Sequence, residues 1–251
     1  MAERVRLSAQ MLVAALGDSW APTEIGIAAE LLAGGKGQFP RGVRALPADL
    51  VRAVQRERIL AAMLRATRQL GYREVRVQDV LERAGVSRPT FYEHFDNKEG
   101  CFLAAFDAAA DRLRDCIDAS ALDSARGWCD RVRAALEGLL RFIAEEPDAA
   151  MTLIVDARAA CPDALVRRDE LLDRLAECLD TCVREGGSAD APPSSIAAAG
   201  IVGGIDALLY SRLSREGTDD LECLLPSLMY FAVLPYEGHE AASEALAVSA
   251  G

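Results

Sequence analysis

Residues 71–98 read GYREVRVQDVLERAGVSRPTFYEHFDNK, and this stretch predicts two short helices joined by a tight turn. Val77, Val80, Leu81 and Ala84 recur at helical spacing, which gives residues 77 to 84 one apolar face. Gly85 then supplies the conformationally permissive residue that a sharp turn needs. The stretch is therefore typical of a helix-turn-helix, whose second helix enters a DNA major groove.

The second helix is predicted over about residues 88 to 94. Ser87 is a good N-cap, and Pro89 is tolerated in a first turn, where an amide has no partner within the helix. Phe91 and Phe95 are four residues apart and are expected to pack inward. The residues left to face outward all carry donors: Arg88, Thr90, Tyr92 and His94. A short helix with one buried face and one donor-rich face suits contact with base edges and phosphates.

These residues resemble the recognition-helix signature of the tetracycline-repressor (TetR) family. The resemblance is carried by Val86-Ser87, Thr90-Phe91-Tyr92, His94-Phe95 and Lys98, with Ala84-Gly85 before them and Leu103 and Phe106 after them. It covers about residues 54 to 106 closely and is only architectural beyond them. The chain departs from the family at Arg76, where a threonine usually caps the first helix of the motif and touches phosphate. Arginine can reach phosphate, but it cannot cap in the same way.

Charge is distributed unevenly along the chain, whose net charge is −11. Residues 36 to 98 hold 13 Lys and Arg against 7 Asp and Glu, a net charge of +6, which leaves −17 for the remainder. A basic module attached to an acidic body directs phosphate attraction to one face. The composition therefore agrees with DNA binding, although the whole chain is acidic.

The periodicity predicts an all-α fold. The resemblance implies that a three-helix DNA-binding domain is followed by a helical ligand-binding and dimerisation domain. We predict three parts: an N-terminal extension and basic arm (1–47), the helix-turn-helix domain (48–100) and the helical body (101–251). The helix supporting the motif is expected over about residues 48 to 70, and a connecting helix over 99 to 119. The body is expected to contain helices near 125–145, 148–160, 163–185, 193–215 and 218–235.

The DNA contacts are expected to divide into base readers and phosphate contacts. Arg88 and Thr90 are the candidate base readers, and Tyr92, His94 and Lys98 are expected to hold phosphates and set the register. The remaining candidates on or beside the motif are Arg76, Ser87 and Pro89. Arg41 and Arg44 lie in the basic arm, which resembles an arm found in a subset of the family, and they are candidates for a neighbouring minor groove. The alternative for the arm is a solvated loop.

The resemblance implies a ligand pocket in the body and a dimer formed by the last two long helices. Candidate pocket residues are Trp128, Phe142, Met151, Ile154, Arg158 and Tyr210, because a pocket needs apolar walls with a few polar anchors. Candidate residues of the dimer interface are Gly200, Gly203, Gly204 and Leu208. The alternatives are plain core for the first set and packing within one chain for the glycines.

Catalytic, cofactor and metal sites are not expected. The seven cysteines form no Cys-x-x-Cys pair, and only two histidines are present, so a Cys/His zinc site has few ligands to draw on. No phosphate-binding loop or nucleophile elbow appears. Cys178 and Cys182 are four residues apart on a predicted helix, which leaves a thiol sensor or thiol enzyme as an alternative.

The chain is expected to be cytoplasmic. No uninterrupted apolar run reaches membrane-spanning length, because Gly203-Gly204 and Asp206 break the longest, from Ala197 to Leu209. No convincing cleavage site follows the weak apolar segment from Leu7 to Leu16.

The sequence therefore indicates a homodimeric regulator that binds a palindromic operator in double-stranded DNA. We expect a repressor whose operator binding is relieved by a small molecule. The alternatives are an architectural DNA-binding protein that needs no ligand, and the thiol sensor or enzyme.

Overall fold

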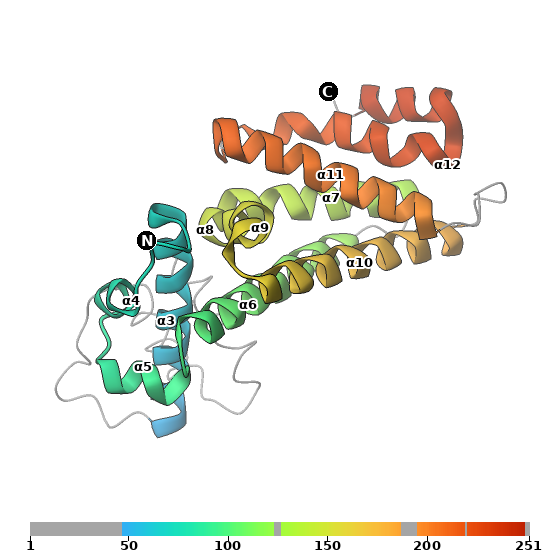
Figure 1. Cartoon of the computed structure of the whole chain (residues 1–251). Helices are drawn as coiled ribbons and strands as arrows, with labels where there is room; N and C mark the ends of the chain where they lie inside the picture. The colour runs from blue at the N-terminus through green and yellow to red at the C-terminus, as the bar shows by residue number, and fades with distance from the viewer. Residues whose placement is uncertain (1–46, 123–126, 187–194, 219, 249–251) are drawn as a thin grey trace. The chain divides into compact units, whose positions relative to one another are not determined.

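A computed structural model describes residues 47–122, 127–186, 195–218 and 220–248 (Figure 1). The chain divides into two compact units, Met1–Ala105 and Phe106–Gly251. Every regular element within the described ranges is helical, which confirms the predicted fold class. The proposed basic arm, with Arg41 and Arg44, lies outside the described residues. The domain boundaries placed at residues 47 and 100 stay predictions.

The first unit contains α3 (Ala48–Leu70), α4 (Val77–Ala84), α5 (Arg88–His94) and the start of α6 (Lys98–Leu122). The bounds of α3, α4 and α5 agree with the sequence-based ones because each is set by a local signal at its ends. Their inner faces form a core that excludes water almost completely. The largest fully buried side chains of this core are Ile59, Met63, Phe91 and Phe102.

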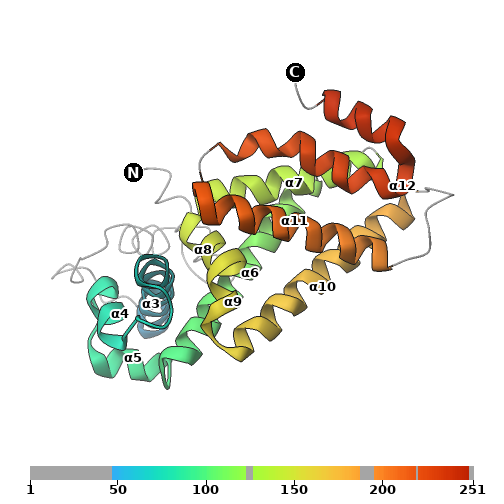
Figure 2. The same ribbon diagram turned by 45° about the horizontal axis from the view of Figure 1, so that its top comes forward.

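The second unit contains α7 (Trp128–Glu145), α8 (Pro147–Met151), a π-helical turn (Thr152–Asp156), α9 (Ala157–Ala160), α10 (Pro162–Glu185), α11 (Ser195–Glu216), a 3₁₀ turn (Leu221–Leu224) and α12 (Leu225–Val248). α10 packs along α11, and α12 packs on α7 (Figure 2). Phe142, Ile143, Leu228 and Met229 are fully buried between these helices.

Two helices of this unit differ from the predicted ones. The single helix expected over 148–160 is interrupted by the π-helical turn, which inserts one extra residue per turn and shifts the side chains that follow. The last helix does not stop near residue 235. Pro235 lies inside α12, and helical structure resumes after Gly238, whose φ of 79° and ψ of −175° mark a kink. A proline removes one amide donor but does not end a helix that is held by packing on both sides of it.

The apolar run from Ala197 to Leu209 lies within the helix α11. Among the described residues, Ile196–Glu216 is one helix long and apolar enough to span a membrane by length and composition, and 22% of its most apolar window is buried. Its central carboxylate, Asp206, is buried in ion pairs with two arginines of the same unit. Among the described residues of this helix, Ile196 and Leu208 are large apolar side chains that stay exposed.

Candidate functional site

The turn between α4 and α5 depends on Gly85. Its backbone is left-handed, with φ 65° and ψ 37°, and its amide donates to the carbonyl of Leu81 at 2.9 Å. A Cβ atom there would lie 2.7 Å from Nη2 of Arg58, a buried side chain of α3. Glycine is therefore required both for the dihedral angle and for the close approach of α3.

The start of α5 is capped as expected. Oγ of Ser87 accepts the amide of Thr90 at 3.2 Å, and its distance to Oγ1 of Thr90 is 2.8 Å. Pro89 occupies the first turn. Thr90, one of the two candidate base readers, is half-buried, and its hydroxyl is already engaged with the cap. A base contact by Thr90 would thus share this hydroxyl with Ser87 or use its methyl group.

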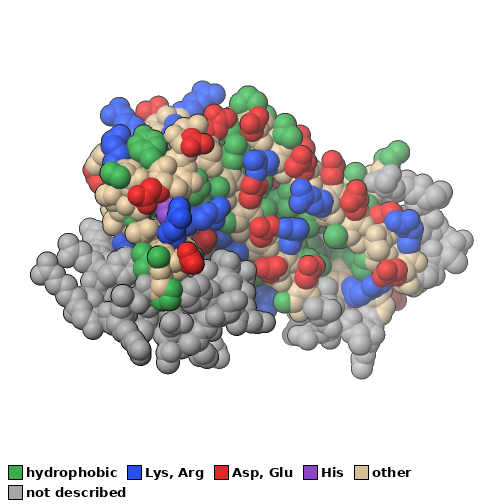
Figure 3. Space-filling model, turned by 90° about the horizontal axis from the view of Figure 1, so that it is seen from below, with side chains coloured by type: hydrophobic (Ala, Val, Ile, Leu, Met, Phe, Trp, Pro, Cys, Tyr) green, Lys and Arg blue, Asp and Glu red, His purple; other side chains and the backbone are tan. Residues whose placement is uncertain are grey.

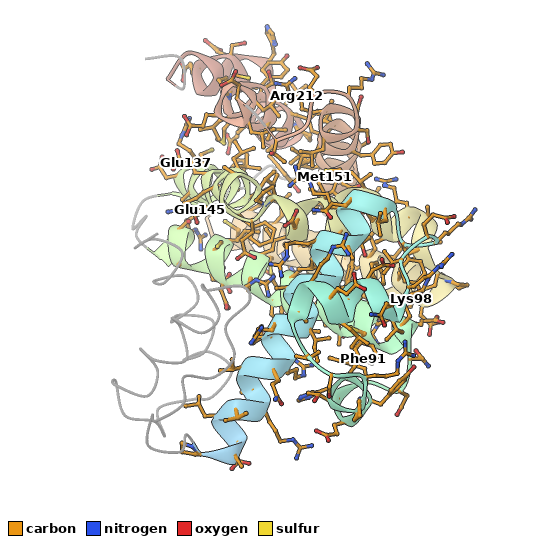
Figure 4. All side chains as sticks on the ribbon, turned by 90° about the vertical axis from the view of Figure 1, so that its left-hand side faces the viewer. Phe91, Lys98, Glu137, Glu145, Met151 and Arg212 are labelled. Carbon is orange, nitrogen blue, oxygen red and sulfur yellow. The ribbon has the colours of Figure 1, made fainter. Side chains whose placement is uncertain are left out.

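The helix α5 has an exposed outer face and a buried inner face. Arg88, Pro89 and Tyr92 are exposed, whereas Phe91 is fully buried beneath them (Figure 4). Nη2 of Arg88 donates to Oε1 of Gln78 on α4 at 3.3 Å, a long bond that a nucleic acid can replace. The expectation that Phe91 and Phe95 pack inward is confirmed, because both are buried.

His94 lies at the end of α5, near two arginines of α3. Burial lowers the pKa of His94, and the positive charges of Arg52 and Arg56 lower it further. Figure 3 shows Lys and Arg side chains beside a histidine. The imidazole is thus neutral at neutral pH, and its buried Nε2 has no hydrogen-bond partner within the described part of the chain. The formal positive charges at this edge come from the arginines.

Lys98 has a structural role besides its charge. Its ammonium donates to the carbonyl of Tyr72 at 2.9 Å and lies 4.3 Å from the centre of the Tyr72 ring. These contacts hold the first residue of α6 against the segment that follows α3. Helix N-termini also favour anions, although Asn97 already accepts the amides of Gly100 and Cys101 in this first turn.

Arg76 precedes α4 and does not cap it with its side chain, as its lack of an acceptor requires. Instead, Oδ2 of Asp79 accepts the amide of Arg76 at 2.8 Å. This contact satisfies one backbone donor and leaves the exposed guanidinium of Arg76 available. The cap of α4 is thus supplied from within the helix.

The described part of the motif presents donors on two adjacent segments. The start of α4 carries Arg76, and α5 carries Arg88, Tyr92 and the Ser87–Thr90 pair. The roles assigned to these residues in DNA contact stay predictions, but their burial pattern has the form that major-groove reading requires.

In the second unit, the six candidate pocket residues separate into three places. Phe142 and Ile154 line a narrow cavity of about 60 Å³ between α7, the π-helical turn, α10 and α11. Arg158 and Tyr210 are outside the lining of this cavity and contact each other, with the guanidinium carbon 4.3 Å from the ring centre. Trp128 is buried elsewhere and donates to Glu237 at 3.0 Å, and Met151 lines neither cavity described here.

Sequence reasoning missed Arg168 and Asp206 as site residues. Both are buried and line the narrow cavity. Oδ2 of Asp206 accepts Nη2 of Arg168 and Nη2 of Arg158. The available signal was a single carboxylate within the apolar run from Ala197 to Leu209, which we had interpreted only as an interruption.

A wider cavity of about 540 Å³ adjoins the narrow one. The two share Leu139, Leu175, Val202 and Ile205 as lining residues, and the wider cavity continues along α7 and α10. Cys178 and Cys182 also line it. Burial raises the pKa of both thiols, which reduces the reactive thiolate fraction and disfavours the thiol alternative.

The candidate dimer residues divide into two groups. Gly200 and Gly203 are exposed and open, and Leu208 is 50% exposed on the same helix. A Cβ atom on Gly204, in contrast, would lie 2.5 Å from Cε1 of Phe231 on α12. Gly204 therefore serves packing within one chain, which is the alternative that the sequence left open.

Comparison with known proteins matches residues 59–105 to the profile described as "Bacterial regulatory proteins, tetR family". The chain is 30% identical to the HTH-type transcriptional activator FasR of Mycolicibacterium smegmatis, over 49% of this chain and 64% of FasR. It is 32% identical to the HTH-type transcriptional regulator AlkX of Mycobacterium tuberculosis, over 49% of this chain and 57% of AlkX. The chain thus spans about half to two thirds of the length of the curated relatives that it matches.

Among solved structures, the fold is similar to the regulator FadR of Bacillus subtilis in complex with stearoyl-CoA. The TM-score is 0.64 at 18% identity, and the match covers 71% of this chain and 98% of that one. At this identity the likeness concerns the fold, which extends beyond the helix-turn-helix into the helical body.

Proposed function

Because this chain is a transcriptional regulator of the TetR family with a DNA-binding helix-turn-helix, we propose that it represses transcription by binding a palindromic operator. The regulator acts as a homodimer in the cytoplasm, and a small molecule bound in its helical body releases the operator. The family is one of regulators rather than enzymes.

One observation carries this proposal: the exposed, donor-rich face of α5 above the buried Phe91. In the proposed complex, Arg88 and Thr90 read base edges, and Tyr92, His94 and Lys98 hold phosphates. Arg76 adds a phosphate contact at the start of α4. Base contacts specify the operator, whereas the phosphate contacts set register and supply the salt-dependent part of the affinity.

The exposed apolar face of α11 and α12 supports the homodimer. Ile196 is 79% exposed, Leu208 50%, and Phe231 and Leu234 are 37% and 36% exposed. Large apolar side chains that gather on adjacent helices mark protein-binding surfaces. A two-fold axis through this face would present two copies of α5, which suits successive major grooves about 34–36 Å apart.

The two adjoining cavities support control by a ligand, because binding sites are concave and mostly apolar with a few polar groups. A ligand shifts an equilibrium only if it prefers one of the two conformations. In the proposed mechanism the ligand favours a dimer geometry in which the two recognition helices no longer match the operator. The solved structure of FadR, which has a similar fold, is a complex with stearoyl-CoA, so a regulator of this fold binds a small molecule.

Operator selection tests the proposal. The full-length protein is used to select fragments from random DNA, and a gel shift with the selected palindrome then measures affinity for the wild type and for Arg88→Ala. Loss of sequence preference in the variant supports base reading by α5, whereas unchanged preference contradicts it. The matched control is Arg184→Ala, an exposed arginine on α10.

The basic arm is tested by two truncations. Removal of residues 1–35 is expected to leave affinity largely intact, whereas removal of 1–47 also deletes Lys36, Arg41 and Arg44 and is expected to lower it. Equal affinities would assign the arm to a solvated loop.

Activation of transcription is the alternative to repression, because the relative FasR is named an activator. A reporter gene placed behind the selected operator distinguishes the two: repression lowers expression when the regulator is present, and activation raises it. A third possibility, an architectural protein without an effector, would show operator binding that no ligand changes.

A further inference from the structure

The charged residues that line the narrow cavity differ from those that line the wide one, and this difference indicates the chemistry of a ligand. The narrow cavity is lined by apolar residues of α6, α7, α10 and α11, and its polar lining residues are Arg168 and Asp206. Because four lining residues are common to both cavities, they form one apolar channel with a buried charged end. This inference rests on the proposed ligand-binding function.

The narrow end of the channel brings two arginines to one carboxylate. Arg168 lines the narrow cavity and Arg158, whose side chain is 32% exposed, lies outside the lining of both cavities; the guanidinium groups of both donate to Asp206. Nη1 of Arg168 also donates to Oδ1 of Asp169 at 3.2 Å, and the Asp169 side chain is 70% exposed. A carboxylate in water screens a buried guanidinium much less than a buried carboxylate does.

Arg168 also has an unused donor. Its side chain is 10% exposed, yet Nε is buried and has no hydrogen-bond partner among the described residues. A buried donor on a charged group without a partner is costly, and an acceptor that reaches it gains the full value of a charge-assisted bond. The carboxylate of a ligand is an acceptor that can form such a charge-assisted bond with Nε of Arg168.

The wide part of the channel has the opposite charge. The ionised residues that line it are Asp118, Glu177 and Glu185 against one arginine, Arg131. Arg131 already donates to Glu185 at 3.1 Å and to the carbonyl of Cys182 at 2.8 Å. A headgroup with several phosphates would meet net negative charge there, which disfavours a coenzyme A thioester at this opening.

We propose that the channel binds a free hydrophobic monocarboxylic acid, with its carboxylate at Arg168 and Arg158 and its hydrocarbon chain in the wide cavity. The wide part, of about 540 Å³, is large enough for an extended alkyl chain. The acid, and not its thioester, is the effector of this regulator.

Calorimetric titration of the full-length protein tests the ligand class. The probes are sodium dodecanoate, methyl dodecanoate and dodecanoyl-CoA, all kept below their micelle concentrations. The acid is expected to bind at least about tenfold more tightly than the other two, because a site built to pair with a carboxylate leaves buried donors unpaired when that group is absent. Equal binding of the ester, or tighter binding of the thioester, would overturn the inference.

Two variants test whether the carboxylate of dodecanoate binds at Arg168 and Asp206. Arg168→Gln is expected to lower the affinity for dodecanoate by about tenfold or more. Arg168→Gln also leaves Asp206 with one partner fewer, so a complementary variant is needed. Asp206→Asn removes the carboxylate that competes for Arg168, and the affinity for dodecanoate is expected to rise. The matched control is Arg167→Gln on the same helix, because Arg167 pairs with Asp107 and lines neither part of the channel. Unchanged affinity in both Arg168→Gln and Asp206→Asn contradicts the assignment.

Operator release separates this inference from the proposed function. If dodecanoyl-CoA releases the operator and dodecanoate does not, ligand control stands and the free acid is the wrong class. If the protein binds no operator specifically, the proposed function fails, and the calorimetric ranking of the three probes still decides the ligand class.

Discussion

Replacing Gly85 by alanine is expected to loosen the helix-turn-helix without affecting the rest of the chain. An L-residue in the left-handed conformation that Gly85 adopts costs about 1–2 kcal/mol. The new Cβ atom would also lie 2.7 Å from Nη2 of Arg58, so the buried guanidinium must move as well. We therefore expect local destabilisation of about 2–3 kcal/mol, within the range of single substitutions that strain both backbone and packing.

Hydrogen exchange measured by mass spectrometry on the full-length protein resolves this local effect. Because about 1.4 kcal/mol corresponds to a tenfold change in an opening equilibrium, amides of α4 and α5 should exchange about 30- to 100-fold faster. Amides of α10 should exchange as in the wild type, since α10 belongs to the other unit. Operator affinity should fall in parallel, because the angle between α4 and α5 is set at this turn.

Two further substitutions separate the causes. Gly85→Asn keeps the Cβ atom but tolerates the left-handed conformation, so it isolates the contact with Arg58. Gly100→Ala is the control: Gly100 is helical, a Cβ atom there would lie 3.6 Å from Oδ1 of Asn97, and alanine favours a helix. If Gly85→Ala exchanges no faster than Gly100→Ala, the reasoning about the turn is wrong.

Four further predictions concern single side chains. Tyr92→Ala should weaken operator binding by about 1–3 kcal/mol in a gel shift with unchanged thermal stability, because Tyr92 is 47% exposed; a matching loss of stability would count against a contact role. Lys98→Ala should weaken binding to all sequences alike and reduce the salt slope by about 1, and retention of the slope would exclude a phosphate contact. Gly203→Arg should abolish the dimer in sedimentation analysis and leave circular dichroism unchanged, since the position is open in the monomer; a dimeric variant would refute the interface. Burial holds the pKa of folded His94 below 6.5, so on acidification the unfolded chain binds the proton before the folded one does. The free energy of unfolding should therefore fall as the pH drops through about 6.5. Denaturation at pH 7 and at pH 5 measures this fall, and His94→Asn should remove the part that His94 contributes.

The helix-turn-helix could be predicted from the sequence because its signals are local. The Ser87 side chain caps α5 by accepting the amide of Thr90, only three residues further on. Gly85 ends α4, and the buried Phe91 holds α5 against the core; both act within one helical turn. Such signals depend only on residues that are neighbours in the chain, so they can be recognised in the amino-acid sequence itself. The fold class and the family resemblance followed from the same stretch.

The body was harder to predict because its features depend on residues far apart in the chain. The interruption at Thr152–Asp156 and the continuation of α12 past Pro235 are decided by packing against other helices. Gly204 has the same sequence character as Gly203, yet it contacts Phe231, whereas Gly203 is open. Periodicity does not distinguish an inward from an outward small residue on a helix that is apolar nearly all round.

The charged end of the channel was decided by tertiary structure alone. Arg158, Arg168 and Asp206 come from three separate helices, and each is unremarkable in its own segment. Their interaction arises only when folding brings them together and buries Arg168 and Asp206, because the energies of charges depend on the groups and the solvent around them. Local helix signals in the sequence thus predicted the segment that we expect to contact DNA, and the tertiary structure brought together the charged residues on which the proposed ligand class depends.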